Sequence, residues 1–391
     1  MVRHRTKEVN LMNRRGFLKI AGGGVVLAAT GAGAFVATRS PAAALAPWAE
    51  AGAARYADPR LNALSYAILA PNPHNRQPWL VELSGDDTVI LRFDTDRQLP
   101  HTDPLDRQLT IGLGCFLELM DMAANASGYR VERTLFPDGE DPAALDARPV
   151  ARARFVADPT VATDPLWAAV PHRRSLKEPF DTTRPVPREA LDVLLAASRH
   201  GMMLGGTVDP EQVATWRWLT GEALLIEIET PRTYIESVDL FRIGKREIEA
   251  NPDGIDFSGP IFETLGTLGL FTRASASDTS TPVYRQGLAA VLENTSTAMG
   301  HVWMVSRGNT RADQIAAGGD WLRVNLAATS VGLGFQPLSQ ALQEYPEMDA
   351  LYREVHDRLA PDGGTVQMLS RIGYGPDVPV SPRWPLEAKL V

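Results

Sequence analysis

The chain has 391 residues, of which 44% are hydrophobic, 22% charged and 7% aromatic, so it is long enough for two ordinary domains with a sizeable core. This composition excludes a disordered chain, a coiled coil, a collagen-like fibre and a polytopic membrane protein. The single cysteine, Cys115, excludes a disulfide framework within the chain and a metal cluster built on cysteines.

The net charge of −8 at pH 7 is unevenly distributed along the chain. Residues 1–46 hold seven of the 39 Lys and Arg residues but only one of the 47 Asp and Glu residues, so the remainder carries a net charge of −14. Nucleic-acid binding depends on basic side chains that neutralise phosphate charges, and a segment this acidic is a poor candidate for it. We therefore expect no nucleic-acid partner.

The N-terminus has the layout of an export signal. Arg14 and Arg15, followed by Gly-Phe-Leu-Lys, precede an uncharged run over residues 20–38, and small residues then follow through residues 42–46. This order matches the basic region, apolar region and A-x-A cleavage site of a secreted precursor. The pattern predicts an export signal over residues 1–46, and its paired arginines resemble the twin-arginine motif.

This signal makes the twin-arginine export machinery an expected partner and places the protein in the periplasm or another extracytoplasmic compartment. As the motif implies, that route moves proteins already folded, often with a cofactor loaded. A retained N-terminal anchor is the alternative, because the nineteen residues 20–38 could just span a bilayer. In either case we expect contact with the membrane only through this signal.

After the signal, helical and strand-like segments alternate. Apolar residues recur at helical spacing in two segments of the first part and at strand-like spacing in four. The sequence predicts helices near residues 59–69 and 109–125, strands near 79–83, 88–93, 129–134 and 151–156, and a surface loop over 137–149. Cys115 lies among apolar residues of the second helix, so we interpret it as a core residue rather than a nucleophile.

The second part begins near residue 164. It has six segments with helical patterning and two with strand patterning. The sequence predicts helices near residues 188–198, 210–229, 233–249, 284–300, 311–331 and 348–359, and strands near 302–306 and 365–372. Residues 251–282 are rich in Gly, Ser, Thr and Pro and indicate an irregular insertion that acts as a lid or flap. Mixed strands and amphipathic helices predict an α+β fold.

The first chemically informative segment is the loop over residues 70–79. Two prolines and two asparagines fix it between a helix and a strand, and it carries His74, Asn75 and Gln77. A rigid polar loop of this kind could form hydrogen bonds with the edge of a planar heterocycle. The alternative is a purely structural turn whose histidine finds its hydrogen-bond partners within the protein. The local pattern alone favours that alternative.

Two further segments carry candidate anion-binding groups. Arg173 and Arg174 are followed by Ser175, and adjacent guanidinium groups match phosphate oxygens in a bidentate manner. A solvated basic patch is the alternative for this triplet. In the C-terminal part, residues 332–340 predict a loop of exposed backbone N–H groups after a long helix. Arg383, near a terminal Gly-Tyr-Gly, lies in a Pro-Arg-Trp-Pro sequence that favours a fixed position.

Taken together, four ordered motifs resemble the FMN-dependent nitroreductase superfamily, most closely its single-chain subgroup that includes the Acg-like proteins. They are Pro-x-x-His-Asn-x-Gln-Pro-Trp, Arg-Arg-Ser, Gly-Leu-Gly-Phe-Gln-Pro-Leu, and Gly-Tyr-Gly with Pro-Arg-x-Pro-Leu, over residues 59–390. The resemblance implies a nitroreductase-like fold with a central, mainly antiparallel sheet flanked by helices. Because the histidine loop precedes Arg-Arg-Ser here, it also implies a pseudo-dimer of two fused halves, residues 47–165 and 166–391, with one FMN per chain.

The resemblance also implies which residues bind the cofactor. Arg173 and Arg383 would hold the FMN phosphate, and Arg174 and Ser175 would contact the phosphate and ribityl chain. The remaining implied contacts are to the flavin ring, from His74, Asn75 and Gln77 in the first half and from Gln336, Pro337, Leu338 and Ser339 near N5. No side chain need act as a catalytic nucleophile, because the flavin carries the redox chemistry. The histidines lack metal-ligand spacing, so we expect no metal.

The expected function is that of an exported FMN oxidoreductase. Its flavin would pass a hydride or electrons from a small-molecule donor, NAD(P)H in the family, to a nitro compound, quinone or similar acceptor. An FMN-sequestering protein without turnover is the alternative, with residues 251–282 folded over the flavin. NAD(P)H is scarce outside the cytoplasm, which favours the alternative. A third interpretation is a degenerate protein of this fold that binds some other small ligand.

Overall fold

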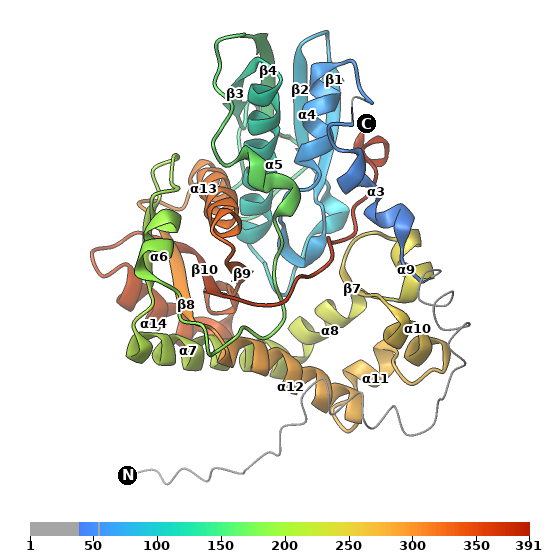
Figure 1. Ribbon diagram of the computed structural model, residues 1–391, viewed down its shortest axis with the longest axis vertical. Coiled ribbons are helices and arrows are strands. Elements are labelled where there is room, and N and C mark those ends of the chain that lie inside the picture. The colour runs from blue at the N-terminus through green and yellow to red at the C-terminus, as the bar shows by residue number, and fades with distance from the viewer. Residues whose placement is uncertain (1–38, 54) are drawn as a thin grey trace.

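The computed structural model describes residues 39–53 and 55–391 of the chain (Figure 1). The twin-arginine motif and the apolar run of the predicted signal lie outside these described residues. Residues 42–46, the end of that predicted signal, form the first part of a helix, α3 (Ala42–Glu50). The predicted boundary at residue 46 therefore falls inside a helix, and cleavage there stays a prediction.

Two four-stranded antiparallel sheets form the framework. The first sheet has the order β1-β2-β4-β3, and the second has the order β5-β8-β10-β9. The strands of the first sheet are β1 (Trp79–Ser84), β2 (Thr88–Phe93), β3 (Tyr129–Leu135) and β4 (Pro149–Ala157). Those of the second are β5 (Met203–Thr207), β8 (Gly300–Ser306), β9 (Gly334–Pro337) and β10 (Thr365–Gly373). A short parallel pair, β6 (Phe241–Ile243) and β7 (Ile255–Phe257), lies apart from both sheets.

Helices pack around and between the two sheets. Those before β5 are α3, α4 (Pro59–Ala67), α5 (Arg107–Ala126) and α6 (Arg188–Leu195). After β5 come α7 (Pro210–Glu229), α8 (Pro231–Asp239), α9 (Gly244–Ala250), α10 (Pro260–Thr267), α11 (Arg273–Ser277), α12 (Pro282–Ser296), α13 (Arg311–Ser330) and α14 (Asp349–Leu359). The expected class is confirmed as mixed α and β with antiparallel sheets flanked by helices, although the strands form two sheets rather than one.

The core is centred on the long helices α5 and α13, which lie side by side (Figure 1). Each has 20 residues, and most residues of α5 are buried, in keeping with its largely apolar sequence. Within the described residues, α5 alone is long and apolar enough to cross a bilayer, and 83% of its most apolar window is buried. Cys115 is 1% exposed, and burial raises the pKa of its thiol to about 12. Its interpretation as a core residue is confirmed.

Two sequence predictions in the second half were wrong in detail. The helix predicted over residues 233–249 is divided into α8, β6 and α9, because Gly244 has a φ of 78° and residues 241–243 pair with β7. Residues 251–282 are not irregular throughout, since they contain β7, α10 and α11. The short strand β5 was not predicted. Its sequence, Met-Leu-Gly-Gly-Thr, contains two glycines, which are depleted in strands.

The C-terminal segment returns to the first half of the chain. After β10, residues 374–391 run across the molecule toward β1, as the red trace in Figure 1 shows. Leu390 forms an isolated parallel bridge with Val81, and the Val391 N–H donates to the Val81 carbonyl at 2.9 Å. This path brings Arg383 beside the loop that precedes β1.

Candidate functional site

The loop before β1 has unusual backbone geometry. His74, Asn75 and Gln77 have φ values of 45°, 51° and 52°, in the left-handed region that residues other than glycine rarely adopt. Each such residue costs on the order of 1–3 kcal/mol and persists only where its surroundings impose the conformation. Three of them within four positions mark this loop as a candidate functional segment.

Gln77 is held by three separate parts of the chain and is fully buried. Its N–H donates to the Asn72 side-chain oxygen at 2.7 Å, and its Nε2 donates to the Pro252 carbonyl at 2.6 Å. Its Oε1 accepts from the Trp384 N–H at 2.9 Å. The Gln77 side chain therefore joins the loop to the insertion and to the C-terminal segment, and its predicted contact with a cofactor stays a prediction.

Asn75 connects the loop to Arg383. The Arg383 Nη1 donates to Asn75 Oδ1 at 2.6 Å, and the Asn75 Nδ2 donates to the Pro382 carbonyl at 3.0 Å. This pair of hydrogen bonds joins residues that lie 308 and 307 positions apart in the sequence. The fold thus brings together one predicted ring-contacting residue and one predicted phosphate-binding residue.

Arg173 and Arg383 meet at a shared carbonyl. The Leu69 oxygen accepts from Arg173 Nη2 at 3.0 Å and from Arg383 Nη2 at 3.1 Å, and Arg383 also donates to the Ala70 oxygen. Their exposed fractions are 4% and 2%. Burial lowers the pKa of Arg173 to about 10, with a contribution from the charge of Arg174. Burial and the charge of Arg173 lower the pKa of Arg383 to about 9.

These two arginines have donors without acceptors. Arg173 makes one side-chain hydrogen bond, and the Nε of Arg383 is buried without a partner. The buried Arg311 behaves differently, because its Nε, Nη1 and Nη2 all donate to oxygens of the protein. Within the described chain, no carboxylate lies within ion-pair distance of Arg173 or Arg383, although the charge of Asp256 acts on Arg383. Buried charged donors normally find partners, so this arrangement fits an anion.

The indole ring of Trp48 lies against the same guanidinium groups. Its centroid is 5.7 Å, 5.3 Å and 5.6 Å from the Cζ atoms of Arg173, Arg174 and Arg383. An aromatic face attracts cations through its quadrupole. We call Arg173, Arg174, Arg383 and Trp48 the arginine cluster. Sequence reasoning missed Trp48, because nothing in the local pattern separates it from the end of the export signal.

Arg174 and Ser175 lie at the edge of the cluster. Arg174 is half-buried and donates to the Val378 carbonyl at 3.3 Å and to the Pro171 carbonyl at 2.9 Å. Ser175 is partly buried beside it. The N–H of Leu176 then donates to the Phe335 carbonyl at 2.9 Å, which joins this segment to β9. Residues 173–176 therefore link the Leu69 carbonyl to the second sheet.

The region around β9 differs from the prediction. Residues 334–337 form an edge strand paired with β10 rather than a loop of exposed N–H groups. Arg371 donates from Nε to the Gln336 side-chain oxygen at 2.6 Å, and the Leu338 N–H donates to the Leu369 carbonyl at 2.9 Å. Pro337 has no N–H group, and the Ser339 hydroxyl lies 3.5 Å from the Met368 sulfur. The prediction of a loop here was wrong, and contacts of these residues with a flavin stay predictions.

Lys177, which is exposed, and Asp256 are further charged groups that act electrostatically on His74 and Arg383, and sequence reasoning missed both. Lys177 follows Ser175 by two positions, and its charge contributes to lowering the pKa of His74. Burial raises the pKa of Asp256, on β7, and the charge of Lys177 partly opposes this shift. The position of Lys177 beside Arg-Arg-Ser was the available sequence signal. Asp256 offered none, because the insertion carried no recognised motif.

His74 is held as a neutral imidazole. Its Nδ1 is buried without a partner, and its Nε2 lies 3.5 Å from the Ser237 hydroxyl. Burial, together with the charges of Lys177 and Arg76, lowers the pKa of His74 to about 4. At neutral pH the ring therefore adds no charge to the site and leaves one ring nitrogen available for a hydrogen bond.

This lowered pKa gives a pH dependence of stability. Because the folded-state pKa lies below the unfolded value of about 6.5, the contribution of His74 is fully present above pH 6.5 and is lost as the pH falls toward 4. Between pH 6.5 and 4.5, we expect the free energy of unfolding of the wild type to fall by roughly 1–3 kcal/mol more than that of a His74→Asn variant. Asparagine tolerates the left-handed backbone. Urea unfolding at each pH measures the difference, and parallel curves would contradict it.

The insertion is fastened to the strained loop by one carboxylate. Asp253 is 3% exposed and pairs with Arg76 at 3.3 Å, with Arg242 at 2.8 Å and with Arg97. The N–H of Gly254 also donates to the Asn75 carbonyl at 3.3 Å. Two of the three arginines belong to the first half, so Asp253 holds the base of the insertion against the loop.

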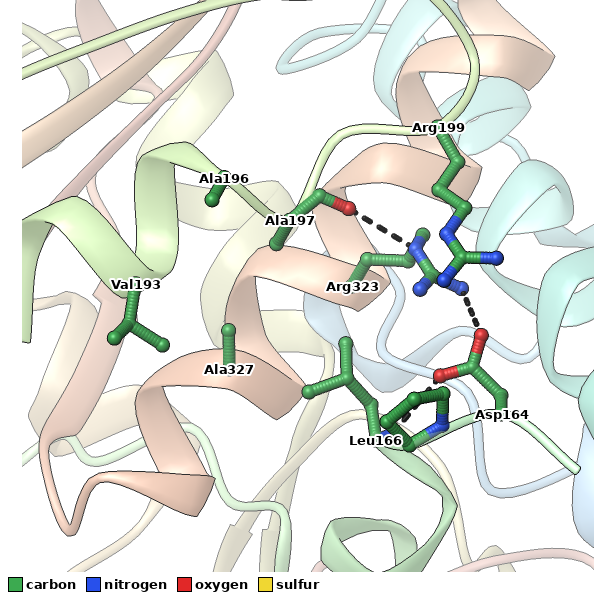
Figure 2. Close-up of a pocket in the computed structure, with 9 residues that line it drawn as sticks. Asp164, Leu166, Val193, Ala196, Ala197, Arg199, Arg323 and Ala327 are labelled. Atoms are coloured by element: carbon green, nitrogen blue, oxygen red, sulfur yellow. Dashed lines mark hydrogen bonds and ion pairs between the residues drawn. The ribbon is translucent and has the colours of Figure 1, made fainter.

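A separate pocket lies between α6 and α13 (Figure 2). It has a volume of about 170 Å³, and Arg323 on its wall donates to Asp164 at 2.8 Å and to the Ala197 carbonyl at 3.0 Å. Arg323 also pairs with Glu118 at 2.9 Å. The charge of Arg323 is thus paired within the protein, unlike those of the arginine cluster. Within residues 39–53 and 55–391, no group of three or more His, Cys, Asp and Glu side chains could hold a metal ion.

The structure is an α+β fold in which residues of both halves surround a buried cluster of positive charges. No protein-family model matches the sequence. The chain is 28% identical over 332 residues to the putative NAD(P)H nitroreductase Rv3131 of Mycobacterium tuberculosis, covering 82% of this chain and 87% of that protein. It is 35% identical over 97 residues to the putative NAD(P)H nitroreductase acg of the same organism, covering 25% and 29%. The first of these similarities extends over most of both chains.

A looser likeness is found among solved structures. The nitroreductase from Bacteroides fragilis, solved with bound FMN, matches with a TM-score of 0.32 and 12% identity, covering 55% of this chain and 90% of that one.

Proposed function

We propose that the protein is an exported, FMN-binding oxidoreductase of the nitroreductase type. It takes a hydride or electrons from a small-molecule donor such as NAD(P)H and passes them to a nitro compound, a quinone or a similar electrophile. The relatives that carry the name NAD(P)H nitroreductase support this assignment of the reaction class. The N-terminal sequence supports export by the twin-arginine route into an extracytoplasmic compartment, with membrane contact only through the signal.

The observation that carries the proposal is the pair of buried guanidinium groups at the Leu69 carbonyl. Two like charges in a low-dielectric site repel each other, and an unsatisfied buried donor costs about 1–3 kcal/mol. A phosphate dianion would accept from the unused donors of Arg173 and from the orphaned Nε of Arg383. The donor set therefore fits the phosphate of FMN.

Other residues of the site suit the flavin ring. The neutral His74 has a ring nitrogen without a partner, and Lys177 supplies a positive charge close to it. Positive charge near the ring favours the anionic reduced form of a flavin. When bound, FMN supplies the hydride and electron transfer, so no side chain has to act as a nucleophile. The protein binds, orients and tunes the cofactor.

We further propose that the chain is a pseudo-dimer with one such site. Each half contributes a four-stranded antiparallel sheet and one of the two helices that pack together in the core, α5 and α13. The strained loop comes from the first half, whereas Arg173 and Arg383 come from the second. Since the site needs both halves, one cofactor per chain is the expected stoichiometry.

FMN sequestration without turnover is a second candidate, and the Asp253 contacts favour it. Three arginines hold this buried carboxylate and fasten the insertion to the loop that carries His74. An insertion fixed in this way would limit the access of a second substrate to the ring. In that case the protein would bind the cofactor tightly and exchange electrons slowly.

Visible absorption of the full chain after cytoplasmic expression tests the proposal. We expect a flavin spectrum with about one FMN per chain, because one arginine cluster is present. Anaerobic addition of NADPH is then expected to bleach the flavin band within the time of an assay. A yellow protein that NADPH leaves unchanged would favour sequestration. A colourless protein that takes up no added FMN would contradict both functions.

A further inference from the structure

Helix α3 packs against α9 and α4 and is hydrogen-bonded to the segment that carries Arg383. The carbonyl of Ala44 accepts from the Arg383 N–H at 2.8 Å, and the Trp48 Nε1 donates to the Ser381 carbonyl at 2.9 Å. On its other side, the N–H of Ala43 lies 3.4 Å from the Glu249 carboxylate of α9. Thus α3 is attached to the segment that positions Arg383.

The helix is too short to be stable alone. Its nine residues include Pro47 in the interior, and isolated helices shorter than about 12–15 residues are marginal even when rich in alanine. Ala44 and Pro47 are buried, so α3 forms because it is docked. Its position is therefore coupled to whatever stabilises the surface on which it docks.

The indole of Trp48 faces three guanidinium groups at once. The three separations lie between 5.3 Å and 5.7 Å, within the range of a cation–π interaction. The ring attracts the cations but cannot neutralise them, because it has no net charge. A phosphate bound to Arg173 and Arg383 would cancel much of the repulsion and would lie beside an apolar wall that excludes water.

We propose that Trp48 on α3 is the outer wall of the cofactor phosphate site, where it retards cofactor release. The proposal rests on the proposed function, since it assumes that the cluster binds the FMN phosphate. It adds a binding residue that precedes every motif of the resemblance. Coupling is reciprocal, so bound phosphate must also hold α3 in place.

Release of FMN from the full-length protein tests this role. Free FMN is strongly fluorescent, so strong dilution of the loaded protein into FMN-free buffer gives the release rate as a rise in fluorescence. We expect Trp48→Ala to release FMN about tenfold faster or more. The variant loses a partly desolvated cation–π contact and the indole ring that covers the phosphate site. Trp48→Phe keeps an aromatic face and is expected to stay within about threefold of wild type.

Trp167→Ala is the matched control. Trp167 is also a partly buried tryptophan, but its ring packs at a tilt against Tyr66, with a centroid distance of 4.7 Å, rather than against an arginine. We expect this variant to release FMN at the wild-type rate. Equal release from Trp48→Ala and wild type, or equal acceleration by Trp167→Ala, would overturn the role of Trp48 while leaving the proposed function intact. A wild type without FMN would instead overturn the proposed function.

Hydrogen exchange provides a second readout if Trp48→Ala folds poorly. In the wild type, backbone amides of residues 42–50 are expected to exchange at least tenfold more slowly with FMN bound than without it, because the phosphate stabilises the docked helix. Exchange that is unchanged by FMN in this segment, while the loop over residues 72–77 becomes protected, would contradict the coupling.

Discussion

The Arg173→Ala/Arg383→Ala double variant is expected to be recovered without flavin and to bind added FMN at least a thousandfold more weakly than wild type. Hydrogen bonds to charged groups contribute about 1.5–3 kcal/mol each, and these two side chains would supply several of them to one phosphate. Removing both side chains also removes their mutual repulsion. We therefore expect the variant to lose FMN affinity while its free energy of unfolding changes little. Fluorescence titration of the apo protein with FMN measures the affinity.

Two further variants make this result specific. Arg383→Lys keeps the charge but loses the fork that donates to Asn75 and Ala70, so we expect an intermediate loss of about tenfold to a hundredfold. Arg311→Ala removes another buried arginine whose donors all bind protein oxygens. It should lower the unfolding temperature but leave the FMN affinity of the folded protein within about threefold. Wild-type affinity in the double variant would show that the phosphate lies elsewhere.

Much of the fold could be predicted from local patterns. Strand β1 begins with alternating buried and less buried residues, β2 is a nearly continuous buried run after a Gly-Asp-Asp turn, and α5 has recurrent apolar spacing, so these signals were strong. Strand β9 was missed because four residues with a glycine and a proline have little strand propensity. Its pairing with β10 is a tertiary contact that local sequence does not encode.

The site was predictable only in part, and for a physical reason. Local chemistry favoured a simple turn for His74 and gave even weight to a basic patch for Arg173, and only the order of motifs pointed to a shared site. The contact between Asn75 and Arg383 joins residues 308 positions apart, which no local pattern can indicate. Trp48 carried no signal at all, because its role depends on where three arginines meet.

The relative position of the two halves depends on one close helix crossing. At this crossing α5 contributes Gly114 and α13 contributes Gly318. A Cβ atom on Gly114 would lie 2.2 Å from the Ile315 carbonyl oxygen, and one on Gly318 would lie 2.1 Å from the Ile111 carbonyl oxygen. Because the clashing atoms belong to helix backbones, no side-chain rotation can relieve them. Only glycine at both positions allows the two helices to approach so closely.

Replacement of either glycine is therefore expected to separate the halves. We expect Gly318→Ala to lower the unfolding midpoint by roughly 5–10 °C or to prevent folding, as overpacking against backbone costs about 1–3 kcal/mol or more. Gly114→Ala should behave similarly. The loop that carries Asn75 also rests on α5, where Gly112 approaches Asn72, so a shifted α5 should weaken FMN binding as well. Thermal unfolding followed by circular dichroism, with FMN titration, measures both effects.

Gly287→Ala on α12 is the matched control for this prediction. A Cβ at Gly287 would meet no atom within 4 Å, and alanine is favoured over glycine in a helix interior by about 0.5–1 kcal/mol. This variant should therefore keep or slightly raise the unfolding midpoint and bind FMN like wild type. If Gly318→Ala instead unfolded at the wild-type temperature, α5 and α13 would be able to separate without loss of stability. The crossing would then not be what fixes the Asn75 loop against the arginines of the second half.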